Sequence, residues 1–379
     1  MKRRICIIAE DYPDTDQPNY PFVQELAYSL SNEGMECSVI APQSLTKAVI
    51  RRLGIKKRVS SDINPEGKEI KVFRPYTVTF SNTRNNSINQ LTFCFFRKAV
   101  QRALNRIGKT DYVYCYFWHI GLATAKALLK SELPLFVQAS ECDIDVIPSY
   151  RTAELLNRVS GVVCASRKNY DESIDAGFIN EKSNTIIVPN GFRRDEFYPI
   201  DKSEVRKRLN IDKDQFVVAF VGDFNERKGS ARLSKAIDQF DDVYSIFIGV
   251  GDKTPSCKNV LFQGTVPHNE LVYYLNCADV FVLPTQAEGC CNAIIEAVAC
   301  GLPVISSNKS FNDEILDESY SIRINENSID EIADAIRKLK NNAEMRKAMS
   351  LKALEASRNL SIEKRAKAIA SFLSGIQTI

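Results

Sequence analysis

Short runs of β-branched and aromatic residues alternate with helix-like segments along almost the whole chain. Examples are RRICIIAE at residues 3–10, DYVYCYF at 111–117, QFVVAFVGDF at 215–224 and DVFVLP at 279–284. Runs that stay apolar on both faces, separated by helices, are typical of parallel strands that helices cover on both sides. The sequence therefore predicts an α/β protein built on parallel sheets.

The chain carries two such series in tandem. Its 379 residues are long for one hydrophobic core, and two domains of about 150–200 residues each fit the length better. The segment PNGFRRDEFYPI at 189–200 mixes Gly, Pro and charge, as linkers do. We expect two doubly wound, Rossmann-like domains facing across a cleft, the first over 1–190 and the second over 191–359. A C-terminal helix at about 360–379 should pack back on the first domain.

Cysteine usage and hydropathy limit where the chain works. There are eleven cysteines, an odd number, with no C-x-x-C pair, and only two histidines. Buried thiols in a reducing compartment fit this pattern better than disulfides or a zinc site. No apolar run approaches about 18–20 residues, and the first run ends at Glu10 and Asp11. We therefore expect neither a membrane span nor a secretory signal, and a cytoplasmic location.

The segment TQAEGCCNAIIEAVACGLPVI, which follows the strand-like run DVFVLP, carries the most chemistry. Glu288 lies in the loop after the strand, Asn292 is a candidate N-cap, and Glu296 lies about one turn into the next helix. A sugar diphosphate needs backbone amides for its oxygens and a carboxylate for its ribose hydroxyls, and this segment offers both. The alternative is a carboxylate that only stabilises its own helix dipole.

The sequence resembles the retaining glycosyltransferases of family 4, the glycosyl transferases group 1, which have the two-Rossmann GT-B fold. The resemblance rests on Glu288 and Glu296 in a Glu-x7-Glu element that continues as EAVACGLPVI, and on four further motifs in the family's order. These motifs are IIVPNGFRRDEFYP, VVAFVGDFNERKG, FIGVGD and NVLFQGTVPHNEL.

The resemblance assigns a donor role to the second domain and an acceptor role to the first. Glu296 would accept hydrogen bonds from the ribose hydroxyls of a sugar nucleotide. Glu288 would hold the transferred sugar, and Lys228 would neutralise the diphosphate leaving group. Further donor-site residues by resemblance are Gly222, Val266, Pro267 and His268, the last three beside the base, and Gly289, Cys290, Cys291, Asn292 and Ala293 in the turn.

Two departures from the family pattern concern charged or catalytic positions. The Arg that the family places five residues before Lys228 is Asp223 here. Arg227 is one candidate replacement, and a solvated loop charge is the other interpretation of it. His119 is a candidate catalytic group, with a loop or core imidazole as the alternative. The acceptor-side candidates are Tyr20, Pro21, Phe22, Ser140 and Glu141.

Metal and cofactor requirements follow from the same comparison. Two D-x-D matches occur, Asp14-Thr15-Asp16 and Asp143-Ile144-Asp145. Such pairs hold Mn²⁺ or Mg²⁺ in transferases of another fold, but their context here differs and we interpret them as chance matches. We expect no metal and no resident cofactor, with a nucleotide-diphosphate sugar as donor substrate. Lys228 and helix N-termini would stabilise the leaving group.

Charge is unevenly distributed. Residues 43–109 hold fifteen basic and three acidic residues, which gives +12 and leaves −9 for the rest of a chain whose net charge is +3. The same segment contains Phe93, Phe95 and Phe96 beside basic residues. One interpretation is a face that docks on an anionic membrane carrying a lipid-linked acceptor. The other is a helix whose aromatic rings enter the core while its basic residues stay solvated.

These observations predict a retaining, metal-independent hexosyltransferase. It would act on a glycan acceptor, lipid-linked in our interpretation, in surface polysaccharide or glycolipid biosynthesis, at the inner face of the cytoplasmic membrane. Alternatives are a sugar-nucleotide 2-epimerase and a nucleotide-sugar-binding protein without turnover, which Asp223 favours. We find no nucleic-acid-binding motif.

Overall fold

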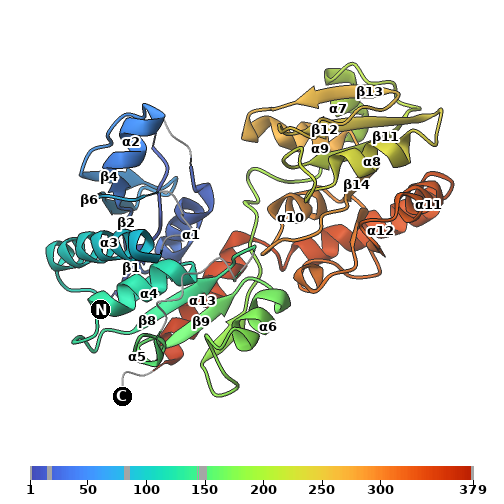
Figure 1. Cartoon of the computed structure of the whole chain (residues 1–379). Coiled ribbons are helices and arrows are strands. Elements are labelled where there is room, and N and C mark those ends of the chain that lie inside the picture. The colour runs from blue at the N-terminus through green and yellow to red at the C-terminus, as the bar shows by residue number, and fades with distance from the viewer. Residues whose placement is uncertain (1, 15–18, 81–85, 143, 145–151, 377–379) are drawn as a thin grey trace. The chain divides into compact units, whose positions relative to one another are not determined.

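The computed structural model forms two compact units (Figure 1). It describes residues 2–14, 19–80, 86–142, 144 and 152–376. Unit 1 comprises residues 1–188 and 365–379, and unit 2 comprises residues 189–364. The sequence analysis places these divisions at 190/191 and at about 360. The chain therefore leaves unit 1, builds all of unit 2 and then returns.

Unit 1 is built on an eight-stranded sheet in the order β10-β9-β8-β7-β1-β2-β5-β4. All neighbouring strands are parallel except β4 and β5, which pair antiparallel. The strands are β1 (Arg4–Ile8), β2 (Glu36–Ile40), β4 (Val59–Ile63), β5 (Glu69–Phe73), β7 (Tyr112–Tyr116), β8 (Leu135–Ala139), β9 (Gly161–Cys164) and β10 (Thr185–Ile187). The short strands β3 (Gln43–Ser44) and β6 (Tyr76–Thr77) pair separately.

Both faces of this sheet are covered, because successive side chains of a strand point to opposite faces. Ile5 and Ile7 of β1 join a core with α1 and α13, whereas Cys6 and Ile8 join a second core with α3 and α4. The helices of unit 1 are α1 (Pro21–Asn32), α2 (Leu45–Arg51), α3 (Asn86–Ile107), α4 (Trp118–Ala127), α5 (Ala153–Leu156), α6 (Arg167–Asp175) and most of α13 (Ile362–Gly375).

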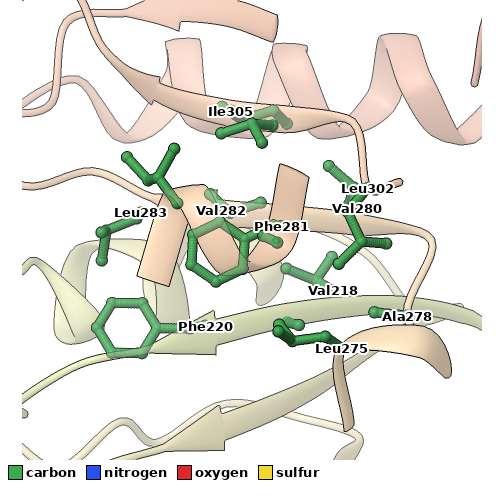
Figure 2. Packing of buried hydrophobic residues seen from close by; sticks show 14 of the residues in the cluster. Val218, Phe220, Leu275, Ala278, Val280, Phe281, Val282, Leu283, Leu302 and Ile305 are labelled. Carbon is green, nitrogen blue, oxygen red and sulfur yellow. The ribbon is translucent and has the colours of Figure 1, made fainter. Parts of the chain in front are cut away.

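Unit 2 is built on six parallel strands in the order β13-β12-β11-β14-β15-β16. The strands are β11 (Phe216–Val221), β12 (Val243–Ile248), β13 (Val260–Gly264), β14 (Val280–Leu283), β15 (Val304–Ser307) and β16 (Ser321–Ile324). In chain order this is 3-2-1-4-5-6, the Rossmann order. Figure 2 shows apolar side chains of β11, β14 and β15, among them Phe220, Phe281 and Ile305, packed in its core.

The helices of unit 2 alternate with these strands. They are α7 (Lys202–Arg208), α8 (Ser230–Ile237), η1 (His268–Glu270), α9 (Leu271–Asn276), α10 (Asn292–Ala299), η2 (Ser310–Asn312), α11 (Ile329–Lys340) and α12 (Ala343–Ser357). Helix α8 packs against α11, and α10 packs against α12. In the part of the chain that the structure describes, no helix is both long and apolar enough to span a bilayer.

The strand order fixes where loops can gather. In unit 1 the order reverses between β1 and β7, and in unit 2 between β11 and β14. Loops that leave the carboxyl ends of such a strand pair diverge to opposite faces and leave a crevice, where ligands of open α/β sheets bind. The predicted α/β class with parallel sheets is confirmed, and the residues to examine are those that follow β1, β7, β11 and β14.

Candidate functional site

The loops after β11 and β14 of unit 2 touch each other at Gly229. This residue precedes α8 with φ 81°, a conformation that favours glycine. A Cβ built on Gly229 would lie 2.5 Å from the carbonyl oxygen of Pro284. No larger residue fits there without moving one loop, so the contact fixes the spacing between Lys228 and the β14 loop.

Glu288 is the centre of a charged cluster in unit 2. Its Oε1 lies 2.6 Å from Lys228 Nζ and 3.0 Å from Arg227 Nη1, and it accepts a hydrogen bond of 2.8 Å from Thr285 Oγ1. The side chains of Glu288 and Lys228 are only 9% and 13% exposed. Burial alone would lower the pKa of the Lys228 ammonium, but Cys291 and Glu288 beside it raise that pKa. Lys228 therefore stays charged at neutral pH.

Arg232, on the first turn of α8, holds the surrounding loops in place. Its guanidinium donates to three carbonyl oxygens: Glu226 O after β11 at 2.7 Å, Pro284 O after β14 at 2.9 Å and Glu326 O after β16 at 2.8 Å. The planar guanidinium suits this task because its donors point in fixed directions. Arg232 was not among the predicted site residues, because a single helical Arg carries no pattern that separates it from a surface charge.

The Glu288–Glu296 segment is a turn followed by a helix, as predicted. Cys291, with extended backbone, precedes α10, and Asn292 is the first helical residue. The expected N-cap role of Asn292 is therefore wrong. Its side chain instead accepts a hydrogen bond of 2.8 Å from Asn190 Nδ2, and Asn190 N donates to Cys290 Sγ at 3.3 Å. Asn190 thus ties the linker motif to the turn.

Glu296 and His268 lie together in unit 2. His268 Nε2 is 3.6 Å from Glu296 Oε1, and His268 Nδ1 is 3.4 Å from Glu196 Oε2. The Phe197 ring packs edge-on against the imidazole at 5.2 Å between centroids. Hydrogen bonding to Glu196 and then to Glu296 raises the pKa of His268 to about 10. Glu196 was not among the predicted site residues, because it is one of several charges in the linker motif.

The remaining donor-side candidates lie around these groups. A Cβ on Gly222 would lie 3.3 Å from the Lys228 side chain, so this glycine borders the cluster. Val266 packs on the core, while Pro267 is exposed. Asp223 is exposed, and Arg227 occupies the place beside Lys228.

This edge of unit 2 is suited to a phosphorylated ligand with hydroxyl groups. Two cations converge on one carboxylate, and the N-terminus of α8 adds the partial positive charge of its free amides. A diphosphate can take over the cations from Glu288 and leave that carboxylate free to accept hydrogen bonds from hydroxyl groups. Glu296 offers a second acceptor.

In unit 1, a second polar cluster forms after β1 and β7. His119 Nε2 lies 2.9 Å from Glu10 Oε1, and Tyr20 Oη donates to Glu10 Oε2 at 2.6 Å. The hydrogen bond from His119 outweighs burial and holds the pKa of Glu10 at about 2. His119 is the second residue of α4, and its ring stacks on Phe117 at 6.0 Å. Glu10 was not among the predicted site residues.

Glu141 adjoins that cluster, because it lies close enough to His119 for their charges to interact. Glu141 Oε1 accepts from Trp118 N at 2.5 Å, and its Oε2 accepts from Ser140 N at 2.9 Å. Burial raises the pKa of Glu141 above its ordinary value. This carboxylate therefore holds the start of α4.

The two other acceptor-side candidates of unit 1 lie at the start of α1. Pro21 is the first residue of that helix. Phe22 packs between the rings of Tyr20 and Tyr116, at 5.3 and 5.4 Å between centroids. This packing places the Tyr20 hydroxyl beside Glu10.

Among the described residues, no three His, Cys, Asp or Glu side chains gather as the ligands of a metal ion would. The structure describes only part of the two D-x-D segments, which we interpret as chance matches. Thr15, Asp16, Asp143 and Asp145 lie outside the described residues.

Comparison with known proteins agrees with this geometry. The family "Glycosyl transferases group 1" matches residues 201–355, the part of unit 2 that contains the Glu288 cluster. Residues 201–355 are therefore similar to the group 1 glycosyltransferases. The predicted family is thereby confirmed, and its match covers every strand of unit 2.

Relatives and solved structures extend this likeness to the rest of the chain. The putative teichuronic acid biosynthesis glycosyltransferase TuaC of Bacillus subtilis is 26% identical over 88% of each chain. The alpha-galactosylglucosyldiacylglycerol synthase of Streptococcus pneumoniae is 25% identical over 65% of this chain and 66% of its own. The structure of Anabaena Alr3699/HepE with UDP-glucose aligns over 98% of this chain and 99% of its own, with TM-score 0.69 and 17% identity. The predicted GT-B fold is confirmed.

Proposed function

We propose that the chain transfers a hexose from a nucleotide-diphosphate sugar to a glycan acceptor. The observation that carries this is the convergence of Lys228 and Arg227 on the buried carboxylate of Glu288, next to the N-terminus of α8. A diphosphate leaving group needs positive charge, and a transferred sugar needs a hydrogen-bond acceptor. The family match over 201–355 and the UDP-glucose bound to the Anabaena relative in fold support this donor class.

Each donor group then has a part in the reaction. Lys228 and Arg227 would bind the diphosphate and stabilise its charge as it leaves, so that no metal is required. Glu288 would exchange its two cations for hydroxyl groups of the sugar. Glu296, held by His268 at 3.6 Å, would accept from the ribose hydroxyls. Arg227 would replace the family Arg that is Asp223 here.

We propose that transfer retains the anomeric configuration. The bond between the anomeric carbon and the diphosphate oxygen breaks with its electron pair going to the phosphate. The acceptor hydroxyl oxygen forms the new bond on the same face, and its proton passes to the departing phosphate oxygen. The contribution of the protein would be positioning and leaving-group stabilisation.

The acceptor would bind at the unit 1 cluster of Glu10, His119 and Tyr20. Two ionisable groups and a hydroxyl at the carboxyl ends of β1 and β7 can orient hydroxyl groups of a glycan. TuaC acts in teichuronic acid biosynthesis by its name, and the pneumococcal relative makes a glycosylated diacylglycerol. They support a surface polysaccharide or a lipid-linked glycan as the acceptor class, met at the inner face of the cytoplasmic membrane.

A thermal-shift panel with UDP-, GDP- and ADP-sugars, followed by a donor hydrolysis assay without acceptor, tests the proposal. We expect one nucleotide to raise the melting temperature and its sugar to be released slowly. Glu296→Ala should weaken donor binding about tenfold or more, since hydrogen bonds to a charged group contribute about 1.5–3 kcal/mol each. Glu318→Ala, an exposed carboxylate, is the matched control. Unchanged donor affinity in Glu296→Ala would overturn the site assignment.

A donor-binding protein without turnover is the second candidate, and the exposed Asp223 at the family Arg position favours it. The two differ in hydrolysis. Binding of a nucleotide sugar with no release of sugar, with or without glycan acceptors, would establish this second function. Chromatography of the same reaction mixture for a 2-epimer of the donor separates the epimerase alternative.

A further inference from the structure

Exposed apolar residues are concentrated in one stretch of the sequence of unit 1. Thirteen large apolar residues are exposed among the described residues, and ten of them lie between residues 49 and 95. These ten are Val49, Ile50, Leu53, Ile55, Val59, Ile63, Tyr76, Phe80, Leu91 and Phe95. Single exposed apolar residues are normal, but such a concentration marks an interaction surface.

The two most exposed members belong to α2, and two further members lie in the loop that follows it (Figure 1). Val49 and Ile50 are 79% and 77% exposed, and Leu53 and Ile55 follow within five residues. We call these four residues the α2 apolar surface. Two neighbouring β-branched side chains left in solvent at the end of a helix serve no packing purpose within the unit.

Polar contacts hold this segment with its apolar residues outward. Ser44 caps α2 by accepting from Lys47 N at 3.2 Å, and Thr46 Oγ1 accepts from Thr79 N at 3.2 Å. The fold itself therefore keeps the apolar side chains of this segment directed outward.

The loop after α2 is held through Lys56. Gln43 exchanges two hydrogen bonds with the Lys56 backbone, at 2.9 and 3.0 Å. The Lys56 side chain is almost buried and reaches Asp11 Oδ1 at 2.8 Å and Tyr12 O at 3.1 Å. Lys56 is thus an anchor of the loop.

Basic side chains flank the α2 apolar surface. Lys47 lies on α2, Arg52 follows it, and Lys57 and Arg58 precede β4, all four exposed. No acidic residue occurs between residues 43 and 61. The aromatic residues that the sequence analysis singled out contribute less, because Phe93 and Phe96 pack on the core of unit 1 and Phe95 is 38% exposed.

We propose that α2 and the loop to β4 insert Val49, Ile50, Leu53 and Ile55 into the interface of an anionic lipid bilayer, with the four flanking cations on the headgroups. Exposed apolar residues with Lys and Arg close to them in the chain suit such interfaces, where apolar insertion and charge attraction add. A protein partner of opposite charge would need no wedge at the tip of a short helix. The inference rests on the proposed function for the identity of the acceptor, and the docking itself does not require turnover.

Cosedimentation with vesicles tests the proposal. The full chain should bind vesicles of phosphatidylcholine with 30% phosphatidylglycerol and not vesicles of phosphatidylcholine alone. Val49→Ser together with Ile50→Ser should reduce binding about tenfold or more, because each buried CH₂ contributes about 0.8 kcal/mol. Leu351→Ser in unit 2, where Leu351 is 63% exposed, is the matched control and should leave binding unchanged.

The charge contribution has its own variant. Lys57→Gln with Arg58→Gln should weaken binding about fivefold per charge removed, since each cation near the surface contributes about 1 kcal/mol. Lys207→Gln with Lys213→Gln, two exposed lysines of unit 2, should have no effect.

Two results would overturn the docking proposal while leaving the proposed function standing. One is wild-type binding by the Val49→Ser, Ile50→Ser variant. The other is a wild-type protein that is dimeric in solution together with a variant that is monomeric, because the α2 apolar surface would then bind a second copy of the chain. Donor hydrolysis measured without vesicles reports on the proposed function separately and should be the same in all these variants.

Discussion

Replacing Glu288 by Gln removes one negative charge and leaves two cations behind without changing side-chain size. Lys228 and Glu288 are 13% and 9% exposed, whereas Arg227 is 36% exposed. Removing one partner of a buried pair costs about 3–5 kcal/mol. The amide oxygen of Gln still accepts from Thr285, and solvent screens Arg227. We therefore expect Glu288→Gln to lower the free energy of unfolding by about 3 kcal/mol, near the lower end of that range.

This loss of stability should appear as a lower melting temperature of unit 2. For a unit of this size about 1 kcal/mol corresponds to about 2–4 °C, so Glu288→Gln should melt about 6–12 °C below the wild type. Glu318→Gln, on an exposed carboxylate, controls for loss of charge alone and should melt within about 2 °C of it.

Pyrophosphate gives the experiment its sharper readout, because it contains neither base nor sugar. In the wild type, a bound diphosphate competes with Glu288 for Lys228 and Arg227. In Glu288→Gln this competitor is gone, so pyrophosphate should bind more tightly and raise the melting temperature by a larger amount than in the wild type. Differential scanning calorimetry measures both quantities. Equal pyrophosphate-induced shifts in the two proteins, or an unchanged melting temperature in Glu288→Gln, would refute the assignment of these cations to the diphosphate.

Three further predictions concern unit 2. Lys228→Met should lower the turnover number of donor hydrolysis about a hundredfold or more, and Arg227→Met should lower it about tenfold. The difference is expected because the more buried cation stabilises the charge of the leaving group more strongly. Equal losses in the two variants would show that burial does not determine how much each cation contributes. Gly249→Ala should lower the melting temperature markedly, since φ there is 151° and a Cβ would lie 2.0 Å from a neighbouring carbonyl oxygen, whereas Gly375→Ala, with open space around it, should not. The pKa of His268 is raised from 6.5 to about 10, so its contribution to stability is complete below pH 6.5 and is lost as the pH rises to about 10; melting curves of His268→Gln should fall less over this range than those of the wild type.

The hydrophobic pattern of the sequence predicted the α/β architecture because it indicates which segments are buried. Runs such as FVVAFV and VFVL became β11 and β14, since a strand covered on both faces has little choice but apolar residues. Strand β4 was missed for the complementary reason. Its residues alternate between exposed and half-buried, and as the antiparallel edge of the sheet it lacks an apolar run.

Motif spacing located the donor loops but not the contacts between them. The Glu288–Lys228 pair joins residues 60 positions apart, and the contacts of Arg232 to three separate loops depend on strand order. Glu10 was overlooked because a single acid after a strand has no partner until β1 and β7 lie side by side. The two interpretations of the aromatic residues in 91–96 also needed the fold, in which the half-buried Phe93 and Phe96 pack against the core.

The last helix has a consequence for how the molecule is made. Ala366, Ile369 and Leu373 of α13 are fully buried in the same core as Ile5 and Ile7 of β1, so the surroundings of β1 are complete only once α13, which follows all of unit 2 in the chain, has been synthesised. Residues 189–364 need no such delay and can reach their native state during synthesis. Chains that end before α13 would therefore present a finished unit 2 and an incomplete unit 1, which gives cellular proteases a means of recognising such partial molecules.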